Sequence, residues 1–454
     1  MYSKIYKNIL FPFFDTCLKS RNTSKYIKWL RNTQWWTTEK LRDFQWGELH
    51  KLLDHASVQV PYWKDAFDKL GLRLADIKTY DDFRTLPVID KDLIKAQHYD
   101  LVAVNYRGKT YRKSTGGSTG EPLHFEYTPE SYDWRVACSK RGYGWAGYED
   151  GKKSAYIWGV AIGKVPVLKR IKESLHHAFL RQRYYNCFGF TEQKMKEVIS
   201  DMNKYKPECI VAYTNPLYDF VKYAERSRAI KFKPKAIILA AEKLHEFQRE
   251  KIRAVFGCPV FNTYGSREFM LIASECEMHN GLHVNIENLF VEIIKENGDP
   301  AKPGEMGDIV ITDLHNYGMP FIRYKIGDIA IASDRKCLCG RGLPLIDKIE
   351  GRVLDTIRTP DGRIVPGEFF PHLMKEFNEV RRFQVVQKNL HSLNIKIVKE
   401  KDLPKGRLAF MRNEINKVLG REISVKIDFV KDIPLTRTGK LRVTISKLND
   451  AVNN

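Results

Sequence analysis

Apolar residues recur at helical spacing in several stretches of the chain. Between residues 41 and 58 they fall three or four positions apart, and Val60-Pro61-Tyr62 ends the pattern. We therefore expect residues 1–105 to be mostly helical. The same spacing predicts further helices at 191–205, 217–228 and 245–256.

Short runs of apolar and β-branched residues alternate with these later helices. They lie at 154–160, 209–212, 236–240 and 259–263. Strand–helix alternation of this kind predicts an α/β domain with a largely parallel sheet. Between residues 282 and 332 the pattern changes to consecutive strands separated by turn signals such as Asn297-Gly298-Asp299, which indicates a β-rich subdomain.

The tail of the chain has a pattern of its own. After residue 355 it reads as strand, helix, two strands, helix and strand, with helices at 368–377 and 405–419. This is typical of a small α+β module of about 100 residues. We therefore predict a helical N-terminal region at 1–105, an α/β domain at 106–354 and a C-terminal domain at 355–454.

Composition excludes several classes of protein. The 454 residues are 43% hydrophobic and 12% aromatic, which is too rich in core-forming residues for a disordered chain. No apolar run approaches the roughly 18–20 residues of a membrane-spanning helix. The eight cysteines are thinly spread and no export signal precedes them, so we expect a cytoplasmic protein without a disulfide framework.

Basic residues outnumber acidic ones by 21, which favours partners that carry phosphate or other anionic groups. Residues 1–36 contribute seven Lys or Arg against Asp15 alone, interleaved with apolar and aromatic side chains. This mixture is typical of a helix on an anionic membrane surface, but also of an amphipathic helix packed on its own domain, which is the interpretation that we favour. A second basic stretch, 164–183, either borders an anionic pocket or faces water.

The most specific motif is a hydroxyl- and glycine-rich loop that follows the β-prone segment 110–113. Glycines let a backbone turn its N–H groups inward, so such a loop can wrap a polyphosphate, although the same composition also occurs in flexible linkers. The position of the loop between strand-like segments favours phosphate binding over a flexible linker. The loop consists of Ser114, Thr115, Gly116, Gly117, Ser118, Thr119 and Gly120, followed by Glu121 and Pro122.

Four further segments carry residues suited to a nucleotide. Tyr264, at a predicted strand end, can stack on a base, and Glu268 can hold Mg²⁺. Asp328 follows a glycine and can accept from two ribose hydroxyls. Gly351-Arg352-Val353-Leu354-Asp355 marks the predicted domain boundary, and an exposed turn at 434–442 presents Lys440.

In this order the five segments resemble the adenylate-forming superfamily of acyl-CoA synthetases and ligases. The resemblance is nearest to the phenylacetate–CoA ligase branch and its capsular-polysaccharide relatives of the CapK type. It spans nearly the whole chain and includes Leu86-Pro87-Val88-Ile89-Asp90-Lys91 in the N-terminal region. It implies a large adenylate-forming domain with parallel-rich sheets and a β-rich subdomain, followed by a small mobile α+β C-terminal domain.

The resemblance also implies roles for individual residues. Lys440 and Glu268 are the expected catalytic residues, with Glu268 holding Mg²⁺ and Lys440 reaching the carboxylate and the α-phosphate. Asp355 matches the hinge of the C-terminal domain. The family often has Lys where this chain has Glu121, which departs from the pattern. The residues expected to bind ATP are Ser114 to Gly120, Ala240, Ala241, Glu242, Asn262, Tyr264, Gly265, Ser266, Asp328 and Arg352.

Cysteine and histidine spacing suggests a separate metal site. Cys276, His283, Cys337 and Cys339 make an S₃N set, the composition of structural zinc, while His279 offers an alternative imidazole. The resemblance favours His283. Reduced cysteines near a surface loop would give the same spacing without a metal.

The sequence leads to one preferred function and two alternatives. We expect an ATP-dependent ligase that forms an acyl-adenylate and passes the acyl group to coenzyme A, an amine or a hydroxyl. A basic nucleic-acid-binding protein and an inactive homologue that scaffolds polysaccharide assembly are the alternatives. Candidates for the acyl pocket lie in 143–160 and 210–217 and include Tyr143, Trp145, Trp158 and Tyr213, although aromatic side chains there are equally typical of an ordinary core. Peripheral contact with the inner membrane face through the basic N-terminus stays an alternative to packing of that segment on its own domain.

Overall fold

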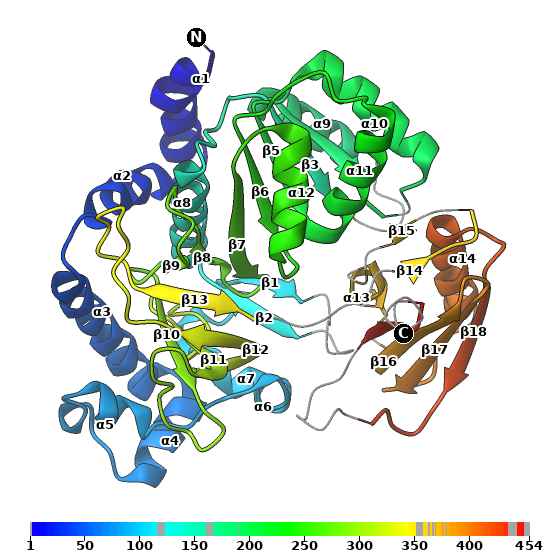
Figure 1. Cartoon of the computed structure of the whole chain (residues 1–454). Coiled ribbons are helices and arrows are strands. Elements are labelled where there is room, and N and C mark those ends of the chain that lie inside the picture. Colours follow the sequence, from blue (N-terminus) through cyan, green and yellow to red (C-terminus); the bar gives the residue numbers. More distant parts are fainter. Residues whose placement is uncertain are drawn as a thin grey trace. The chain divides into compact units, whose positions relative to one another are not determined.

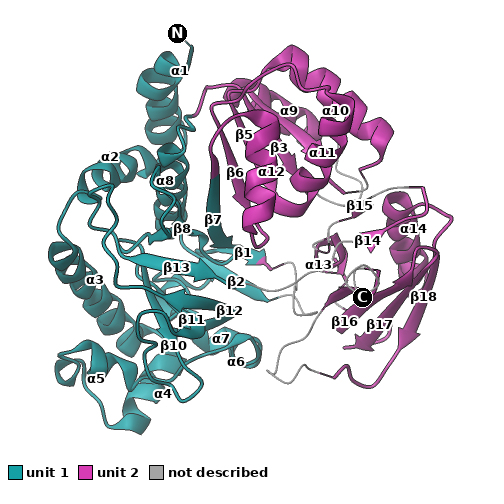
Figure 2. Ribbon diagram, viewed as in Figure 1, with its two compact units in different colours: residues 1–113, 123–149, 261–351 teal, residues 114–122, 150–260, 352–454 magenta. Residues whose placement is uncertain are grey.

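The chain folds into two compact units, shown in different colours in Figure 2. Unit 1 comprises Met1–Lys113, Leu123–Glu149 and Phe261–Gly351, and unit 2 comprises Ser114–Pro122, Asp150–Val260 and Arg352–Asn454. The three-part division expected from the sequence stays a prediction. The computed structural model describes residues 2–115, 123–159, 167–188, 190–350, 357–361, 364–365, 367, 369–374, 376–377, 379–434 and 443–448.

Helices dominate the start of unit 1, as the sequence predicted. The longest, α3 (Thr38–Gln59), begins where the Thr37 hydroxyl accepts from the Lys40 N–H, and α4 (Pro61–Leu70) begins on a proline, which lacks the N–H a first turn leaves unpaired. Gly71, at φ 62°, ends α4. The other helical segments are α1 (Tyr2–Ile5), η1 (Tyr6–Leu10), η2 (Phe13–Leu18), α2 (Thr23–Thr33), η3 (Leu74–Asp76), α5 (Tyr80–Arg84), α6 (Lys91–Ala96), α7 (His98–Leu101), η4 (Val104–Tyr106) and α8 (Pro129–Trp145).

The strands of unit 1 pair in the order β10-β11-β12-β13-β9-β8-β7, and every one of these pairs is antiparallel (Figure 1). This is the β-rich subdomain that the turn signals predicted. Two shorter strands, β1 (Tyr111–Ser114) and β2 (His124–Tyr127), pair with each other. The seven are β7 (Val260–Ser266), β8 (Met270–Ser274), β9 (Leu282–Val284), β10 (Leu289–Ile294), β11 (Met306–Asp313), β12 (Tyr324–Ala332) and β13 (Leu345–Ile349).

Unit 2 contains the parallel sheet that the strand–helix alternation predicted. Its strands run in the order β6-β5-β3-β4, and the pairs β5–β6, β3–β5 and β3–β4 are parallel. Most side chains of the two central strands are fully buried, which explains their near-continuous apolar runs. The elements are β3 (Ser154–Trp158), α9 (Val167–Leu180), β4 (Gln182–Asn186), α10 (Glu192–Tyr205), β5 (Cys209–Tyr213), α11 (Thr214–Ser227), β6 (Ala236–Ala240) and α12 (Glu246–Phe256).

The C-terminal part of unit 2 is the small α+β module predicted from the sequence. Its sheet has the order β18-β17-β16-β19 and packs apolar side chains such as Phe383 and Ile395 into the core of the unit. Within the described residues, no helix is both long and apolar enough to cross a bilayer. The elements are β14 (Ile357–Arg358), β15 (Ile364–Val365), α13 (Phe369–Met374), β16 (Val380–Asn389), β17 (Ser392–Lys399), α14 (Arg407–Leu419), β18 (Ser424–Phe429) and β19 (Thr444–Ser446).

Candidate functional site

The glycine-rich loop joins two strands that pair with each other. Ser114 ends β1 and the buried Thr115 follows it, while β2 begins at His124. The Glu126 carboxylate of β2 accepts a hydrogen bond from the Arg112 Nε of β1 at 2.9 Å and another from the Thr110 hydroxyl. Side-chain hydrogen bonds therefore connect the two strands on either side of the loop. A strand–loop–strand arrangement is what the phosphate-binding interpretation requires. Gly116, Gly117, Ser118, Thr119, Gly120 and Glu121 lie outside the described residues.

Two pairs of polar side chains connect the Tyr264 segment to β12 within unit 1. The Tyr264 hydroxyl donates to Asp328 Oδ2 at 2.9 Å, and the Tyr324 hydroxyl donates to Glu268 Oε1 at 3.3 Å. Tyr264, Glu268 and Tyr324 are buried and Asp328 is half-buried. The structure therefore brings together the expected adenine-stacking and ribose-binding residues and holds the expected magnesium ligand against the same strand.

The backbone conformation after Tyr264 requires Gly265 and is stabilised by Ser266. A Cβ on Gly265 would lie 2.2 Å from the Met270 carbonyl oxygen, a distance that no side chain tolerates, and the β7–β8 register shifts at this point. The Ser266 hydroxyl accepts from the Phe269 N–H at 3.2 Å and so fixes the turn. Asn262 donates its N–H to the Glu275 carboxylate at 2.7 Å. These residues build the segment that carries Tyr264 and Glu268.

The segment 240–242 lies in unit 2, at the end of β6. Ala241 has a φ of 71°, so the chain turns sharply after Ala240. The Glu242 carboxylate accepts from the Asn215 N–H at 2.7 Å, in the first turn of α11, where a negative charge is favoured. The Thr214 hydroxyl donates to the Glu242 carbonyl at 3.2 Å. The expected adenine-lining segment is thus fixed to the start of a helix.

Arg352, Lys440 and Asp355 lie outside the described residues. Their proposed roles in ribose binding, catalysis and hinge motion stay predictions. The aromatic candidates for an acyl pocket fall in two places. Trp158 and Tyr213 contact each other in unit 2, with ring centroids 4.4 Å apart, whereas Trp145 lies beside His283 in unit 1.

Cys276, His283, Cys337 and Cys339 gather around one point in unit 1. Their ligand atoms all lie within 4.8 Å of one another. The Sγ atoms of Cys276 and Cys337 are 3.6 Å apart, and Cys339 Sγ is 3.4 Å from His283 Nε2. Sulfurs bound to one tetrahedral Zn²⁺ lie about 3.8 Å apart, so the spacing fits that ion.

The surroundings of this cluster orient the histidine and favour the thiolate of Cys339, whereas burial raises the pKa of Cys276 and of Cys337. His283 Nδ1 lies 3.2 Å from the Leu343 carbonyl oxygen, which leaves Nε2 facing the sulfurs. Burial lowers the pKa of His283 to about 4, so the imidazole is neutral, as a metal ligand must be. Burial opposes ionisation of Cys339, but hydrogen bonds from Arg341 lower the pKa of this thiol below its usual value. His279 instead contacts Glu275, at 3.2 Å.

Sequence reasoning missed two features of unit 1. The first is the contact of Tyr324 with Glu268. Tyr324 lies in the same sequence motif as Asp328, but nothing else in the sequence indicates that it contacts Glu268. The second feature is a pair of fully buried ion pairs, Arg135–Asp313 at 2.6 Å and Arg141–Glu287, contributed by α8 and by segments far along the chain. An arginine on a helix looks the same in sequence whether it faces water or a buried carboxylate.

Comparison with known proteins shows what the chain is similar to. Residues 357–447 match the CapK C-terminal domain family. Protein CapK of Staphylococcus aureus is 23% identical over 436 residues, which cover 95% of this chain and 94% of that protein. Phenylacetate-coenzyme A ligase of Escherichia coli (strain K12) is 26% identical over 390 residues, covering 81% and 84% of the two chains.

Solved structures show the same fold at low identity. A 2-hydroxyisobutyryl-CoA ligase in complex with 2-HIB-AMP and CoA superimposes with a TM-score of 0.60 at 18% identity, covering 91% of each chain. The same ligase in its postadenylation state gives a TM-score of 0.56 at 17% identity, again covering 91% of each chain. The chain is therefore a homologue of CapK and of the phenylacetate-CoA ligases, built on the fold of adenylate-forming CoA ligases and carrying a CapK C-terminal domain.

Proposed function

We propose that this chain activates a carboxylic acid with ATP as an acyl-adenylate and then transfers the acyl group to coenzyme A. The proposal includes a role in surface polysaccharide biosynthesis, which rests on the resemblance of the sequence motifs to capsular-polysaccharide relatives of the CapK type. The observation that carries the proposal is the pair of contacts Tyr264–Asp328 and Glu268–Tyr324. They gather, in one unit, residue types that can stack on a base, accept from a ribose and hold a cation.

Each residue has a definite task in this reaction. Tyr264 stacks on the adenine and Asp328 accepts from the ribose hydroxyls. Attack of the substrate carboxylate on the α-phosphorus forms a new P–O bond and releases pyrophosphate, while negative charge builds on the phosphate oxygens. Loop N–H groups between Ser114 and Gly120 and the ammonium of Lys440 stabilise that charge, and Arg352 helps to bind the ribose. Mg²⁺, held by Glu268, supplies further charge neutralisation when bound.

The decisive experiment measures carboxylate-dependent exchange of labelled pyrophosphate into ATP. We expect exchange with the intact chain and its collapse, by about a hundredfold or more, in Lys440→Ala. Lys431→Ala changes another lysine of the same C-terminal module and is the matched control. A panel of acids that includes phenylacetate, run with and without coenzyme A, identifies both the acid and the acceptor.

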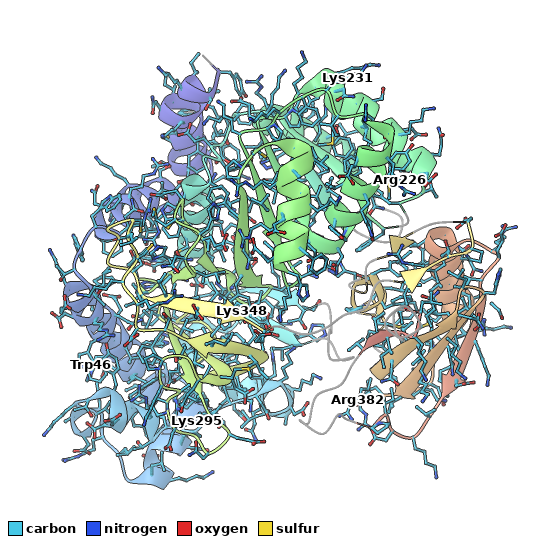
Figure 3. The ribbon with its side chains drawn as sticks, in the orientation of Figure 1. Trp46, Arg226, Lys231, Lys295, Lys348 and Arg382 are labelled. Carbon is cyan, nitrogen blue, oxygen red and sulfur yellow. The ribbon has the colours of Figure 1, made fainter. Side chains whose placement is uncertain are left out.

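Two outcomes contradict the proposal. A folded chain that shows no exchange with any acid of the panel favours the inactive scaffold. Salt-sensitive retention of DNA without exchange favours nucleic-acid binding. The basic residues labelled in Figure 3 lie in both units, and four of them pair with acids: Arg226 with Glu192, Lys295 with Glu305, Lys348 with Glu350 and Arg382 with Asp432.

We further propose that Cys276, His283, Cys337 and Cys339 hold one structural Zn²⁺. Four protein ligands fill a tetrahedral ion, which leaves no position for a substrate, so the ion would stabilise the fold rather than take part in catalysis. The set joins the turn after β8 and strand β9 to the loop before β13, segments that lie about sixty residues apart in the chain.

The N-terminal segment supports peripheral contact with an anionic membrane. Tyr6 and Asp15 are buried, whereas Ile9, Phe13 and Leu18 are each more than half exposed. Segments η1 and η2 are π-helical, with hydrogen bonds that run five residues apart, so side chains at intervals of four or five residues fall on one stripe. Lys4, Lys7 and Lys19 lie in the same stretch of chain. This arrangement fits a helix that lies in the interface of a bilayer.

A further inference from the structure

Helix α9 (Val167–Leu180) exposes a continuous apolar stripe. Leu168, Ile171, Leu175 and Phe179 are 83%, 51%, 67% and 38% exposed, respectively. Their spacing of three, four and four residues puts them on one face of the helix. The side chains of residues 170 to 176 are all exposed as well, so most of the helix stands clear of the described parts of its unit.

This helix contacts its own sheet through a polar side chain and not through its apolar face. The His177 ring stacks on Tyr184 of β4, with centroids 4.3 Å apart and an interplanar angle of 24°. At about 100° of rotation per residue, His177 lies on the side of the helix opposite the centre of the apolar stripe. A surface helix normally buries its apolar face against its own domain. Here a polar side faces the sheet and the apolar stripe faces solvent.

Charge distinguishes α9 from an ordinary unpartnered helix. It carries Lys169, Arg170 and Lys172, and Glu173 is its single acid. At about 100° per residue, the exposed Lys172 lies beside the stripe, next to Phe179, whereas the exposed Arg170 lies on the polar side of the helix, near His177. Leucine and phenylalanine on one face, with basic residues at its edge and on the polar face, is the composition of helices that lie in the interface of an anionic bilayer.

We propose that α9 is a membrane-docking helix, which inserts its apolar stripe among the acyl chains of an anionic lipid surface while its basic residues contact the headgroups. Fourteen residues give a helix of about 21 Å, long enough to lie flat in the interface. The occupant is a lipid surface rather than a second copy of the chain. Self-pairing of two such helices would bring like charges together, which is unfavourable.

The stripe on α9 is independent of the N-terminal stripe. The two belong to different units, and each combines exposed apolar side chains with flanking lysine or arginine. Binding of an amphipathic helix to a membrane scales with its buried apolar area and its attraction to anionic lipids, so each stripe contributes separately. Removal of the α9 stripe alone should therefore weaken attachment measurably.

The test is co-sedimentation of the full-length chain with lipid vesicles. One set consists of phosphatidylcholine alone and the other of three parts phosphatidylcholine to one part phosphatidylglycerol. We expect binding to the second set only, reduced at high salt, and reduced about tenfold in the double variant Leu168→Ser/Leu175→Ser. Val58→Ser is the matched control, because Val58 is 66% exposed, close to the 67% of Leu175, and lies on α3.

Three results overturn the proposal. The first is an absence of binding to either vesicle set by the intact chain. The second is equal binding by the double variant and by the Val58→Ser control, which would assign attachment elsewhere. The third is a concentration-dependent dimer, seen by light scattering, that the double variant abolishes while lipid binding is absent. Circular dichroism of each variant establishes that it is folded, since the substituted side chains are mostly exposed and contribute little to the core.

Discussion

The Tyr264 hydroxyl donates a hydrogen bond to the Asp328 carboxylate at 2.9 Å. The contact crosses from β7 to β12, two strands separated by more than fifty residues of chain. It orients a carboxylate on one strand and restricts an aromatic ring on another before any nucleotide is bound. Preorganisation of this kind lowers the entropy cost of binding, because the two groups no longer need to be ordered by the ligand.

Tyr264→Phe isolates the hydrogen bond from the ring. Phenylalanine keeps the surface for stacking on adenine and removes only the donor to Asp328. We expect a roughly tenfold rise in the KM for ATP in the exchange assay with a smaller effect on kcat, since a hydrogen bond to a charged group is worth about 1.5–3 kcal/mol. Asp328→Ala removes the carboxylate that we propose accepts from the ribose, and should cost about a hundredfold in kcat/KM.

Tyr80→Phe is the control for this pair of variants. Its hydroxyl donates to a backbone carbonyl, that of Arg42, at 3.3 Å, and the contact is exposed. The exchange kinetics of Tyr80→Phe should match those of the unmodified chain. An unchanged KM for ATP in Tyr264→Phe, together with an unchanged KM in Asp328→Ala, would remove both residues from the nucleotide site.

Cys276→Ser tests the zinc proposal. We expect the purified chain to contain about one zinc ion per molecule by mass spectrometry. The variant should contain almost none, because a structural zinc ion with only three protein ligands dissociates when the protein is diluted. Cys258→Ser, at a buried cysteine of unit 2 that is not part of the cluster, should keep the metal. A chelator should lower the free energy of unfolding of the unmodified chain by about 2 kcal/mol or more and leave Cys276→Ser unaffected. A chain that stays free of zinc after reconstitution contradicts the assignment.

Elements with a clear period were predictable from the sequence. The helix predicted at 41–58 is α3, because its helical spacing continues over many residues. The strand predicted at 236–240 coincides with β6, because its apolar run is too short for a typical helix. Strand β4 was missed, since its polar Gln182, Arg183 and Asn186 lie at an edge of the sheet, where burial imposes no apolar pattern. Helix α9 was missed. Its apolar residues recur at helical spacing, but the stretch 164–183 was interpreted from its basic charge alone.

Within the site, composition revealed residue types but not their contacts. A tyrosine at a strand end and an aspartate after Gly327 are visible in sequence, and their hydrogen bond is not, because it depends on strands that pair far apart along the chain. The metal cluster was predictable for a different reason. Cysteine and histidine are uncommon, so four of them with suitable spacing leave few arrangements, and the structure brings the four together.

His315 should make the stability of unit 1 depend on pH. Its ring is buried, stacks on Trp134 at 4.0 Å, and lies 2.9 Å through Nε2 from the Glu287 carbonyl oxygen. Burial lowers the pKa of His315 below its usual value of 6.5, even though Asp313 and Glu48 partly offset the effect. The unfolded chain therefore binds a proton that the folded chain does not, and stability is lost as pH falls from 6.5 through the folded pKa.

His315→Gln removes this titration while it keeps a polar side chain of similar length. We expect the variant to be less stable than the unmodified chain near neutral pH and the difference to shrink as pH falls from about 7 to about 5. Urea denaturation at a series of pH values measures it. Two curves that stay parallel across this range would show that His315 does not carry the acid dependence.

The buried ion pair between Arg141 and Glu287 should be the most sensitive position of unit 1. Arg141 donates from Nη2 to Glu287 Oε2 at 2.8 Å and from Nη1 to the Leu30 carbonyl at 3.2 Å, and the Thr33 hydroxyl donates to Glu287 Oε1 at 2.7 Å. Glu287→Ala leaves a buried guanidinium without its counter-charge. We expect a loss of about 3–5 kcal/mol in the free energy of unfolding, measured by urea denaturation.

Two further variants separate the charge from the packing. Glu225→Ala breaks the ion pair with Lys251, in which the two side chains are 47% and 37% exposed, and should cost no more than about 1 kcal/mol because water already solvates those charges. The double variant Glu287→Met/Arg141→Met removes both buried charges and keeps most of the volume. It should be more stable than Glu287→Ala, since the main cost of that substitution is the uncompensated charge that remains and not the lost attraction. A double variant as unstable as Glu287→Ala would instead assign the loss to the hydrogen bonds that this pair makes with α2.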